Sequence, residues 1–354
     1  MINSRYDQLN LWTKEIIGRL RLGNGKTITL EKVAGDASFR RYFRVWAGSH
    51  SFMAVDAPPE HEDGKSFENI CNLFQQAGLA VPKVHSADHD RGFMLLDDLG
   101  DTLYLDALRD AQQLDQIGIV EDLYQRAIFS LLELQASEHK GILAPFSRKE
   151  LNREMTLFEN WFCGEFLSLT LGHNERDLLD ETFRFLEDAA LGQAEVIVHR
   201  DYHSRNLMIL DPLIFGAEAG PGIIDFQDAV LGAYTYDLVS LLRDCYIRWA
   251  PEQVDKWALD YFKQAAARGI VQEVDQQQFF RDFDLMGLQR HLKVLGIFAR
   301  LYIRDHKPGY LADIPLVIRY FLEVSERYGE FNAFVGWFKK DLLPVARTKL
   351  NLEF

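Results

Sequence analysis

Three side chains with oxygen donors follow one another at a spacing that suits chemistry on a phosphate group. Asp201 ends a His-Arg-Asp run, Asn206 follows it by five residues, and Asp225 lies further along the chain. Phosphoryl transfer needs a hydroxyl placed in line with a phosphate and Mg²⁺ to neutralise the developing charge. Mg²⁺ prefers hard oxygen ligands and takes few of them from the protein. We therefore expect Asp201 to orient an acceptor hydroxyl and take its proton, and Asn206 and Asp225 to bind Mg²⁺.

The spacing of these residues resembles the catalytic loop of kinases. In that loop an Asn follows the Asp of a His-Arg-Asp triplet by five residues, and an Asp-Phe pair lies downstream. A His-Arg-Asp triplet alone is a weak signal, but the Asn and the flanking apolar runs argue against coincidence. Three of these runs predict strands that end at the site, over residues 195–198, 206–210 and 222–225. Strand ends can hold catalytic side chains accurately.

The surrounding elements predict two lobes. Short β-rich runs separated by turns fill the N-terminal part, whereas helical periodicity dominates from Thr102 onward, except around the catalytic loop. We therefore expect an α+β, bilobal, protein-kinase-like fold, with a small antiparallel β N-lobe and a larger helical C-lobe. Its predicted parts are the N-lobe at 1–96, a hinge at 97–100 and the C-lobe at 101–354. Strands are predicted over 27–33, 42–46, 51–55, 83–86 and 93–96, and helices over 1–22 and 66–77.

ATP is expected in the cleft between the predicted lobes. The backbone from Asp97 to Leu99 in the hinge could pair with adenine. The turn that contains Gly35 and Ser38 could cover the phosphates, because small residues let backbone N–H groups approach closely. A solvated turn explains the Asp97 and Asp98 side chains equally well. A turn rich in Gly, Asp and Ser is also common in ordinary hairpins.

Composition limits the classes of function. The chain has 354 residues, 47% of them hydrophobic, and a formal net charge of −14. The acidic balance argues against nucleic acid or an anionic membrane as a partner. No apolar run approaches the ~18 residues of a membrane helix, and the first residues lack the apolar core of a signal peptide. Three scattered cysteines, Cys71, Cys163 and Cys245, fit buried thiols in a reducing cytosol. We expect a cytoplasmic monomer.

Several segments resemble the aminoglycoside phosphotransferase superfamily, which includes choline and homoserine kinases. His203, two residues after Asp201, is typical of that superfamily, whereas protein kinases usually have Lys there. Four blocks resemble more closely the bacterial anomeric kinases of N-acetylmuramate and N-acetylglucosamine. These blocks are G-D-A-S-x-R-R-Y at 35–42, M-A-V-D-A-P-P-E at 53–60, L-D-D-L-G at 96–100 and Q-R-H-L-K-V-L-G at 289–296. The resemblance implies ATP- and Mg²⁺-dependent phosphorylation of the C1 hydroxyl of an amino sugar, giving a sugar 1-phosphate in peptidoglycan recycling.

One position departs from the kinase pattern. The third strand of kinases carries a Lys that contacts the α- and β-phosphates, but the matching position here is Asp56. A carboxylate beside a triphosphate would repel it unless it binds metal or turns away. Arg40, Arg41, Arg44 or Lys65 could supply the missing charge, and we assign Arg44 to the nucleotide. The same departure leaves open a pseudokinase that binds ATP without turnover.

Other polar residues have predicted supporting roles. Asp237 matches an Asp of the superfamily that braces the catalytic-loop backbone, and a buried carboxylate must be hydrogen-bonded to be tolerated. His199 is expected to form hydrogen bonds in the core. His203 could steady the loop or contact the phosphate. The residues assigned to the acceptor are His203, Arg290 and His291.

The helix predicted over 288–304 carries a basic stripe opposite its apolar face. Arg side chains in this stripe could bind the lactyl carboxylate of N-acetylmuramate through two hydrogen bonds. Periodicity alone favours a solvated face instead. The stripe consists of Arg290, Lys293, Arg300 and Arg304.

Other acceptors remain open within the same class of enzyme. An aminoglycoside kinase would need an acidic acceptor pocket, and a choline kinase would need an aromatic cage for the cation. A homoserine kinase is the third alternative. A protein kinase fits less well, because no Ala-Pro-Glu segment follows Asp225.

Overall fold

The computed structural model describes residues 4–22, 28–33, 39–48, 50–138, 141, 143–216 and 219–351. The chain forms two compact units. One comprises Met1–Ala107 and Asn206–Gln227, and the other comprises Leu108–Arg205 and Asp228–Phe354.

The first unit is built on an antiparallel five-stranded sheet with the strand order β1-β2-β3-β5-β4. Strands β2 and β3 form a hairpin in which Arg41 lies opposite Asp56. Because successive side chains point to opposite faces of a strand, this register decides which residues share a face. The strands are β1 (Leu30–Lys32), β2 (Arg41–Ala47), β3 (His50–Asp56), β4 (Val84–Asp88) and β5 (Phe93–Asp97).

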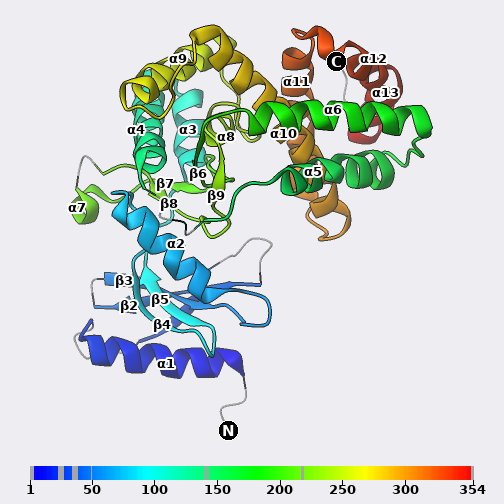
Figure 1. Cartoon of the computed structure of the whole chain (residues 1–354). Coiled ribbons are helices and arrows are strands. Elements are labelled where there is room, and N and C mark those ends of the chain that lie inside the picture. The colour runs from blue at the N-terminus through cyan, green and yellow to red at the C-terminus, as the bar shows by residue number, and fades with distance from the viewer. Residues whose placement is uncertain are drawn as a thin grey trace. The chain divides into compact units, whose positions relative to one another are not determined.

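Two helices cover the two faces of this sheet (Figure 1). Helix α1 (Arg5–Leu20) begins where the Ser4 side chain accepts the N–H of Asp7. Its apolar face packs on alternate residues of β2, β3 and β5, and this burial holds the helix to the sheet. Helix α2 (Gly64–Gln76) begins at Asp63, whose side chain accepts the N–H groups of Lys65 and Ser66.

A short ribbon completes the first unit. Strand β7 (Leu207–Met208) pairs with β8 (Gly222–Ile223), and bridges link the ribbon to Ala80 and Leu103. Helix α7 (Pro212–Phe215) lies between these two strands in the chain.

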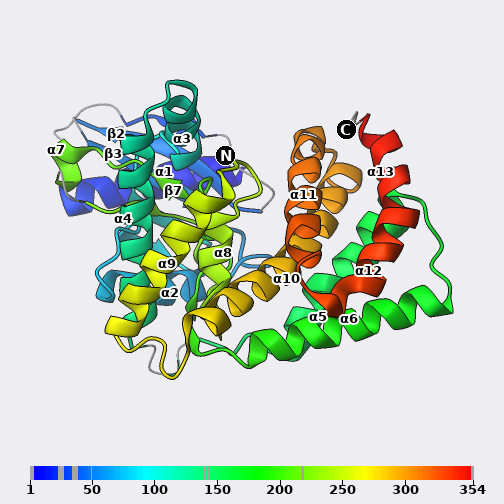
Figure 2. The ribbon, with the colours of Figure 1, turned by 90° about the horizontal axis from the view of Figure 1, so that it is seen from above.

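The second unit is mainly helical, with one two-stranded ribbon of β6 (Glu195–Val198) and β9 (Val230–Ala233). Its central element is the 28-residue helix α10, which packs against α5, α6, α8 and α11 (Figure 2). A π-helical segment, Phe158–Phe166, continues α5. The helices from α3 onward, apart from α7, are α3 (Tyr104–Gln113), α4 (Ile117–Ala136), α5 (Arg148–Leu157), α6 (His173–Leu191), α8 (Tyr236–Leu242), α9 (Pro251–Ala267), α10 (Gln276–Ile303), α11 (Ile314–Ser325), α12 (Asn332–Trp337) and α13 (Leu343–Leu350).

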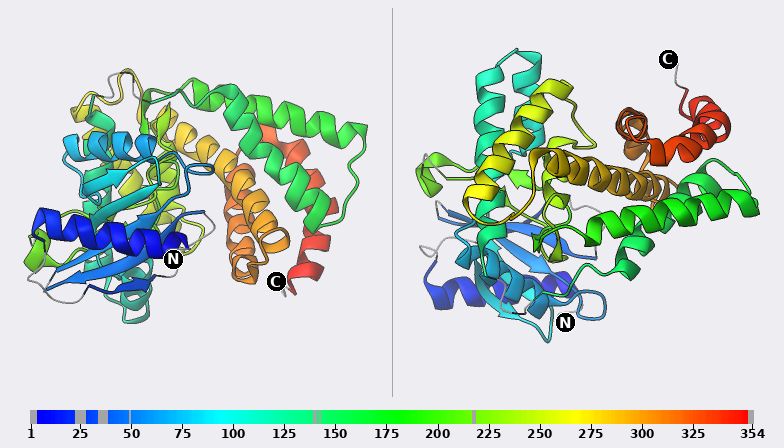
Figure 3. Two further views of the ribbon diagram at one scale, coloured as in Figure 1. Left: turned by 90° about the horizontal axis from the view of Figure 1, so that it is seen from below. Right: turned by 45° about the horizontal axis from the view of Figure 1, so that its top comes forward.

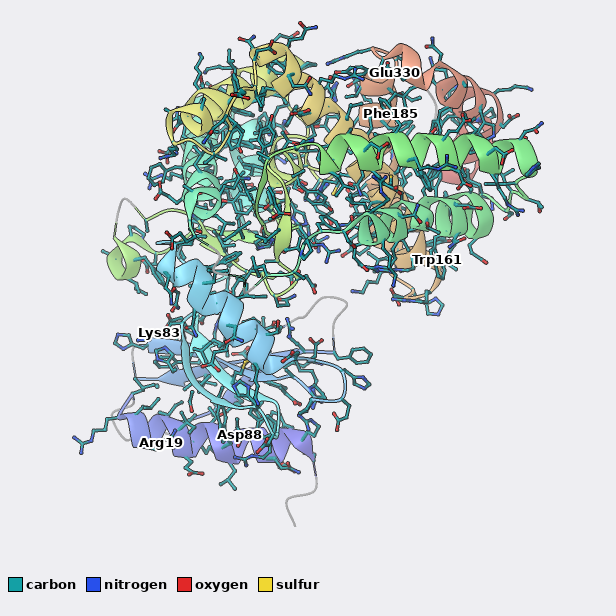
Figure 4. The ribbon with its side chains drawn as sticks, in the orientation of Figure 1. Arg19, Lys83, Asp88, Trp161, Phe185 and Glu330 are labelled. Atoms are coloured by element: carbon teal, nitrogen blue, oxygen red, sulfur yellow. The ribbon has the colours of Figure 1, made fainter. Side chains whose placement is uncertain are left out.

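The C-terminal helices, orange to red in Figure 3, pack with α5, α6 and α10 around one apolar cluster. Polar contacts tie the edges of the cluster together. The guanidinium of Arg281 on α10 lies 5.9 Å from the ring centre of Phe185 and pairs with Glu330 at 2.7 Å; Figure 4 labels these last two residues. The Lys349 ammonium donates to the Phe166 carbonyl at 2.5 Å.

The structure confirms the α+β fold and all five predicted strands of the N-terminal sheet, although their ends shift by a few residues. All three cysteines are buried and free. The expectation of a solvated basic face on α10 is wrong for Arg290 and Lys293, which are 2% and 5% exposed. Among the described residues, no helix is both long and apolar enough to cross a membrane.

Asp56 lies on the α1 face of the sheet. Its carboxylate is completely buried and pairs with Arg5 of α1 at 2.5 Å, and with Arg41 across the hairpin. On β3 it therefore shares a face with Phe52 and Ala54, which pack under α1. The side chain turns away from the opposite face of the sheet, which carries Tyr42 and Arg44. The acid at the strand-three position is thus neutralised by two arginines and links α1 to the sheet.

Replacing Asp56 with Ala should lower the free energy of unfolding by about 2–3 kcal/mol. Loss of one partner from a buried ion pair is costly, but Arg5 and Arg41 keep 34% and 43% of their side-chain surface exposed and can regain water. Urea unfolding measures the change. Asp88→Ala, which removes a surface pair with Arg91, should cost less than about 1 kcal/mol. Equal small losses in both variants would contradict this account.

Candidate active site

The predicted catalytic loop leaves the end of β6, and Asp201 lies three residues beyond that strand. Arg200 has a φ of 78°, an uncommon conformation for a residue with a side chain. Such a conformation persists only where the surroundings fix it. The loop must therefore be held by contacts on several sides.

Two buried carboxylates hold the backbone of the loop. Asp237 on α8 accepts the N–H of His199 at 2.6 Å and that of Arg200 at 3.0 Å. Asp244, just after α8, accepts both the N–H and the hydroxyl of Ser204, at 2.9 and 2.5 Å. The contacts of Asp237 agree with its predicted bracing role.

Asp201 lies among positive charges. Its side chain keeps 41% of its surface exposed, and its Oδ1 lies 3.8 Å from the Lys293 ammonium of α10. Desolvation by the surrounding protein works against the charged form, but Lys293 first, and then His203 and Arg290, outweigh it and lower the pKa of Asp201 well below its usual range. The side chain is therefore an ionised acceptor at neutral pH.

The position of Lys293 depends on the buried carboxylate of Glu154 on α5. Glu154 is 2% exposed and pairs with Arg200 at 2.5 Å and with Lys293 at 3.2 Å. Burial alone would raise the pKa of Glu154, but the two cations reverse the direction and lower it. The Lys293 ammonium also donates to the Tyr236 hydroxyl at 2.9 Å. One buried carboxylate thus holds the catalytic loop and α10 together.

Gly296 lets α10 approach this carboxylate. A Cβ at this position would lie 2.3 Å from the backbone of Leu157, closer than real atoms come. Any side chain would push α10 away from the end of α5 and separate Lys293 from Glu154.

Asn206 and Asp225 lie at the same end of the β7–β8 ribbon. The Ile224 N–H donates to the Asn206 carbonyl at 3.1 Å, so Asp225 follows directly after this pairing. Asp225 is exposed and has a φ of 64°, and its Oδ1 accepts the Gln227 side-chain amide at 2.7 Å. One carboxylate and one side-chain amide are the hard oxygen donors that Mg²⁺ takes in such sites. The donor set fits the metal.

Two residues predicted to bind nucleotide, Gly35 and Ser38, lie outside the described residues. Arg44 is already engaged, because it pairs with Asp98 at 2.6 Å and with Asp101 at 2.7 Å. The alternative of a solvated turn, which explained the side chains of Asp97 and Asp98 equally well, is wrong for Asp98, whose side chain is 2% exposed.

The other hinge residues also make internal contacts. The Asp97 carboxylate contacts His85 Nε2 at 2.6 Å, and its backbone N–H donates to the Lys83 carbonyl at 3.0 Å. Leu99 is buried against Met208 of the ribbon and against Leu210, two residues further along the chain. The assignment of these residues to adenine remains a prediction.

The three residues assigned to the acceptor lie in the second unit, and all are largely buried. His203 is 8% exposed and meets the Tyr246 ring edge to face, and burial lowers its pKa. Arg290 is 2% exposed, and its Nε and Nη1 have no hydrogen-bond partner among the described residues. His291 is completely buried and stacks on Tyr320 with ring centres 5.4 Å apart.

Sequence reasoning missed three contributors to this site. Glu154 and Asp244 carry no motif, and the contact of Lys293 with Asp201 was hidden within a stripe that also fitted a solvated face. A signal existed for Lys293, because it belongs to the same 289–296 block as Arg290. His199 is buried as expected, and its Nδ1 accepts the Asp201 N–H at 3.3 Å.

Comparison with solved structures identifies the class of fold. The chain matches the crystal structure of choline kinase LicA from Streptococcus pneumoniae with a TM-score of 0.58 and 12% identity, covering 89% of this chain and 99% of that one. The fold is thus the protein-kinase-like fold of the choline kinases and aminoglycoside phosphotransferases. The sequence model of the Phosphotransferase enzyme family matches residues 29–273, and the chain belongs to that family.

Curated relatives are similar over most of the chain. The N-acetylmuramate/N-acetylglucosamine kinase of Pseudomonas putida is 40% identical over 330 residues, covering 92% of this chain and 93% of the relative. The protein of the same name from Pseudomonas aeruginosa is 37% identical over 322 residues, covering 90% and 91%.

Replacing Lys293 with Met should shift the acid limb of the kcat/KM profile to higher pH. The lysine lowers the pKa of Asp201, so its loss raises that pKa, and the base becomes protonated at a less acidic pH. Phosphotransfer measured across pH, at a temperature where the variant stays folded, tests this.

The matched control is Lys256→Met, which removes an exposed ammonium on α9 and should leave the limb in place. Lys293→Arg keeps the charge and should restore most of the original profile. A uniform fall in rate with an unshifted limb would mean that Lys293 acts only through packing.

Proposed function

We propose that this chain transfers the γ-phosphoryl group of ATP to the C1 hydroxyl of N-acetylmuramate and N-acetylglucosamine, giving sugar 1-phosphates in peptidoglycan recycling. The observation that carries the proposal is the similarity, over about nine-tenths of the chain, to relatives named for these two sugars. The Asp201, Asn206 and Asp225 set supports an active kinase over a pseudokinase.

In this proposal Asp201 is the general base. Its carboxylate accepts the proton of the sugar hydroxyl as the oxygen forms its bond to the γ-phosphorus. The bond between that phosphorus and the bridging oxygen breaks, and ADP leaves with the electron pair. The low pKa of Asp201 keeps it ionised at neutral pH, while Lys293 and Arg290 limit the charge that gathers at the base.

Asn206 and Asp225 would hold Mg²⁺ through their side-chain oxygens. The metal, when bound, neutralises phosphate charge. The left-handed backbone at Asp225 and its contact with Gln227 fix the direction of that carboxylate.

The acceptor is proposed to contact His203 and Arg290. A buried guanidinium with two unpaired nitrogens is costly unless something else satisfies it. The lactyl carboxylate of N-acetylmuramate has the charge and geometry to do so. His291, the third residue assigned to the acceptor, stacks on Tyr320, and its two ring nitrogens also have no hydrogen-bond partner among the described residues.

The test is ATP consumption by the purified protein with N-acetylmuramate, N-acetylglucosamine, kanamycin, choline and homoserine. Turnover is expected with the two amino sugars. Asp201→Asn should lower kcat about 10²- to 10⁴-fold, the usual contribution of a positioned base. Asp188→Asn, which removes a 69%-exposed carboxylate elsewhere in the same unit, should leave kcat unchanged. ATP binding without turnover on any acceptor would establish the pseudokinase instead.

A further inference from the structure

The kinase pattern calls for a cation near the phosphates, and strand three lacks it. In kinases that cation is a Lys held by the carboxylate of a helix. Since Asp56 is bound to Arg5 and Arg41 on the α1 face, another residue must carry the charge. We infer that Arg40, held by Glu62, is the phosphate-binding cation of this protein. The inference rests on the proposed use of ATP.

Arg40 has the partners that this role needs. Its Nη2 pairs with Glu62 Oε2 at 2.7 Å, and the two side chains are only 6% and 13% exposed. Its guanidinium lies 5.4 Å from the ring centre of Phe67 on α2. The Glu62 carboxylate and the Phe67 ring together fix the guanidinium. The arrangement parallels the Lys–Glu pair of kinases.

The same contacts bring Arg40 close to the predicted metal ligand. The Phe67 ring packs against Phe226, the residue after Asp225, with ring centres 5.0 Å apart. The Tyr42 hydroxyl interacts electrostatically with both Arg40 and Asp225. Burial raises the pKa of Tyr42, Arg40 opposes this increase, and Asp225 adds to it. A cation linked in this way to the carboxylate that would hold Mg²⁺ is placed to meet the phosphates that share this metal.

The three other candidate cations fit less well. Arg41 pairs with the buried Asp56 on the other face of the sheet. Arg44 is offset by two carboxylates, Asp98 and Asp101, and also donates to the Gly100 carbonyl. Lys65 is exposed in the first turn of α2. A charge that is already neutralised twice, or one that is well hydrated, contributes little to binding a phosphate.

The experiment compares Arg40→Met with its neighbour Arg41→Met in the full-length protein. The affinities of ATP, ADP and adenosine are measured by competition with a fluorescent ADP analogue, and thermal unfolding monitors the fold. Arg40→Met should weaken ATP and ADP about 10- to 100-fold, as expected for loss of a charge-assisted hydrogen bond. It should leave adenosine unchanged, and Arg40→Lys should recover part of the loss. Arg41→Met should lower the unfolding temperature but preserve ATP affinity.

Several results would overturn the inference. One is equal weakening of ATP and adenosine by Arg40→Met, which indicates a structural role. Another is a loss of ATP affinity in Lys65→Met with none in Arg40→Met. The measurement needs no acceptor, so it is independent of the sugar. If the wild-type protein does not bind ATP, the proposed function fails rather than the assignment of Arg40.

Discussion

The candidate base, Asp201, depends on the ion pairs formed by the buried carboxylate of Glu154. This carboxylate neutralises Arg200 of the catalytic loop and Lys293 of α10 at once, at 2.5 and 3.2 Å. Without it, two cations would lie close together in a region with little water, and their repulsion would separate loop and helix. With it, α10 can bring Lys293 and Arg290 toward Asp201. Gly296 completes the arrangement because it permits the close approach of α10 to Leu157.

A second constraint operates in the β-sheet unit, where Asp56 and Arg44 lie on opposite faces of the sheet. Asp56 is directed to α1 and neutralised there by Arg5 and Arg41. The opposite face keeps Tyr42 and Arg44, and Arg40 lies beside Tyr42. The carboxylate at the strand-three position therefore lies on the opposite face of the sheet from Tyr42 and Arg44. The feature that raised the pseudokinase alternative is better explained as a clamp between helix and sheet.

Local patterns in the sequence predicted the fold and part of the site. Strand periodicity located the five-stranded sheet, and the spacing of Asp201, Asn206 and Asp225 selected the residues that we propose for catalysis. Glu154 could not be predicted, because its partners are 46 and 139 residues away and only tertiary packing brings them together. For α10, periodicity indicated a polar stripe, but it could not distinguish a solvated face from one buried against the carboxylates of Glu154 and Asp201. Likewise, the face of the sheet to which Asp56 points could not be predicted, since it depends on the register of β3 with β2.

The most direct test of the account is the site of phosphorylation on the sugar. N-acetylglucosamine labelled with ¹³C at C1 would be incubated with ATP, Mg²⁺ and the wild-type protein, and followed by ¹³C and ³¹P NMR. We expect a new phosphate signal coupled to the labelled carbon, formed together with ADP. A sugar phosphate whose phosphorus does not couple to C1, or ADP formed without any sugar phosphate, would contradict it.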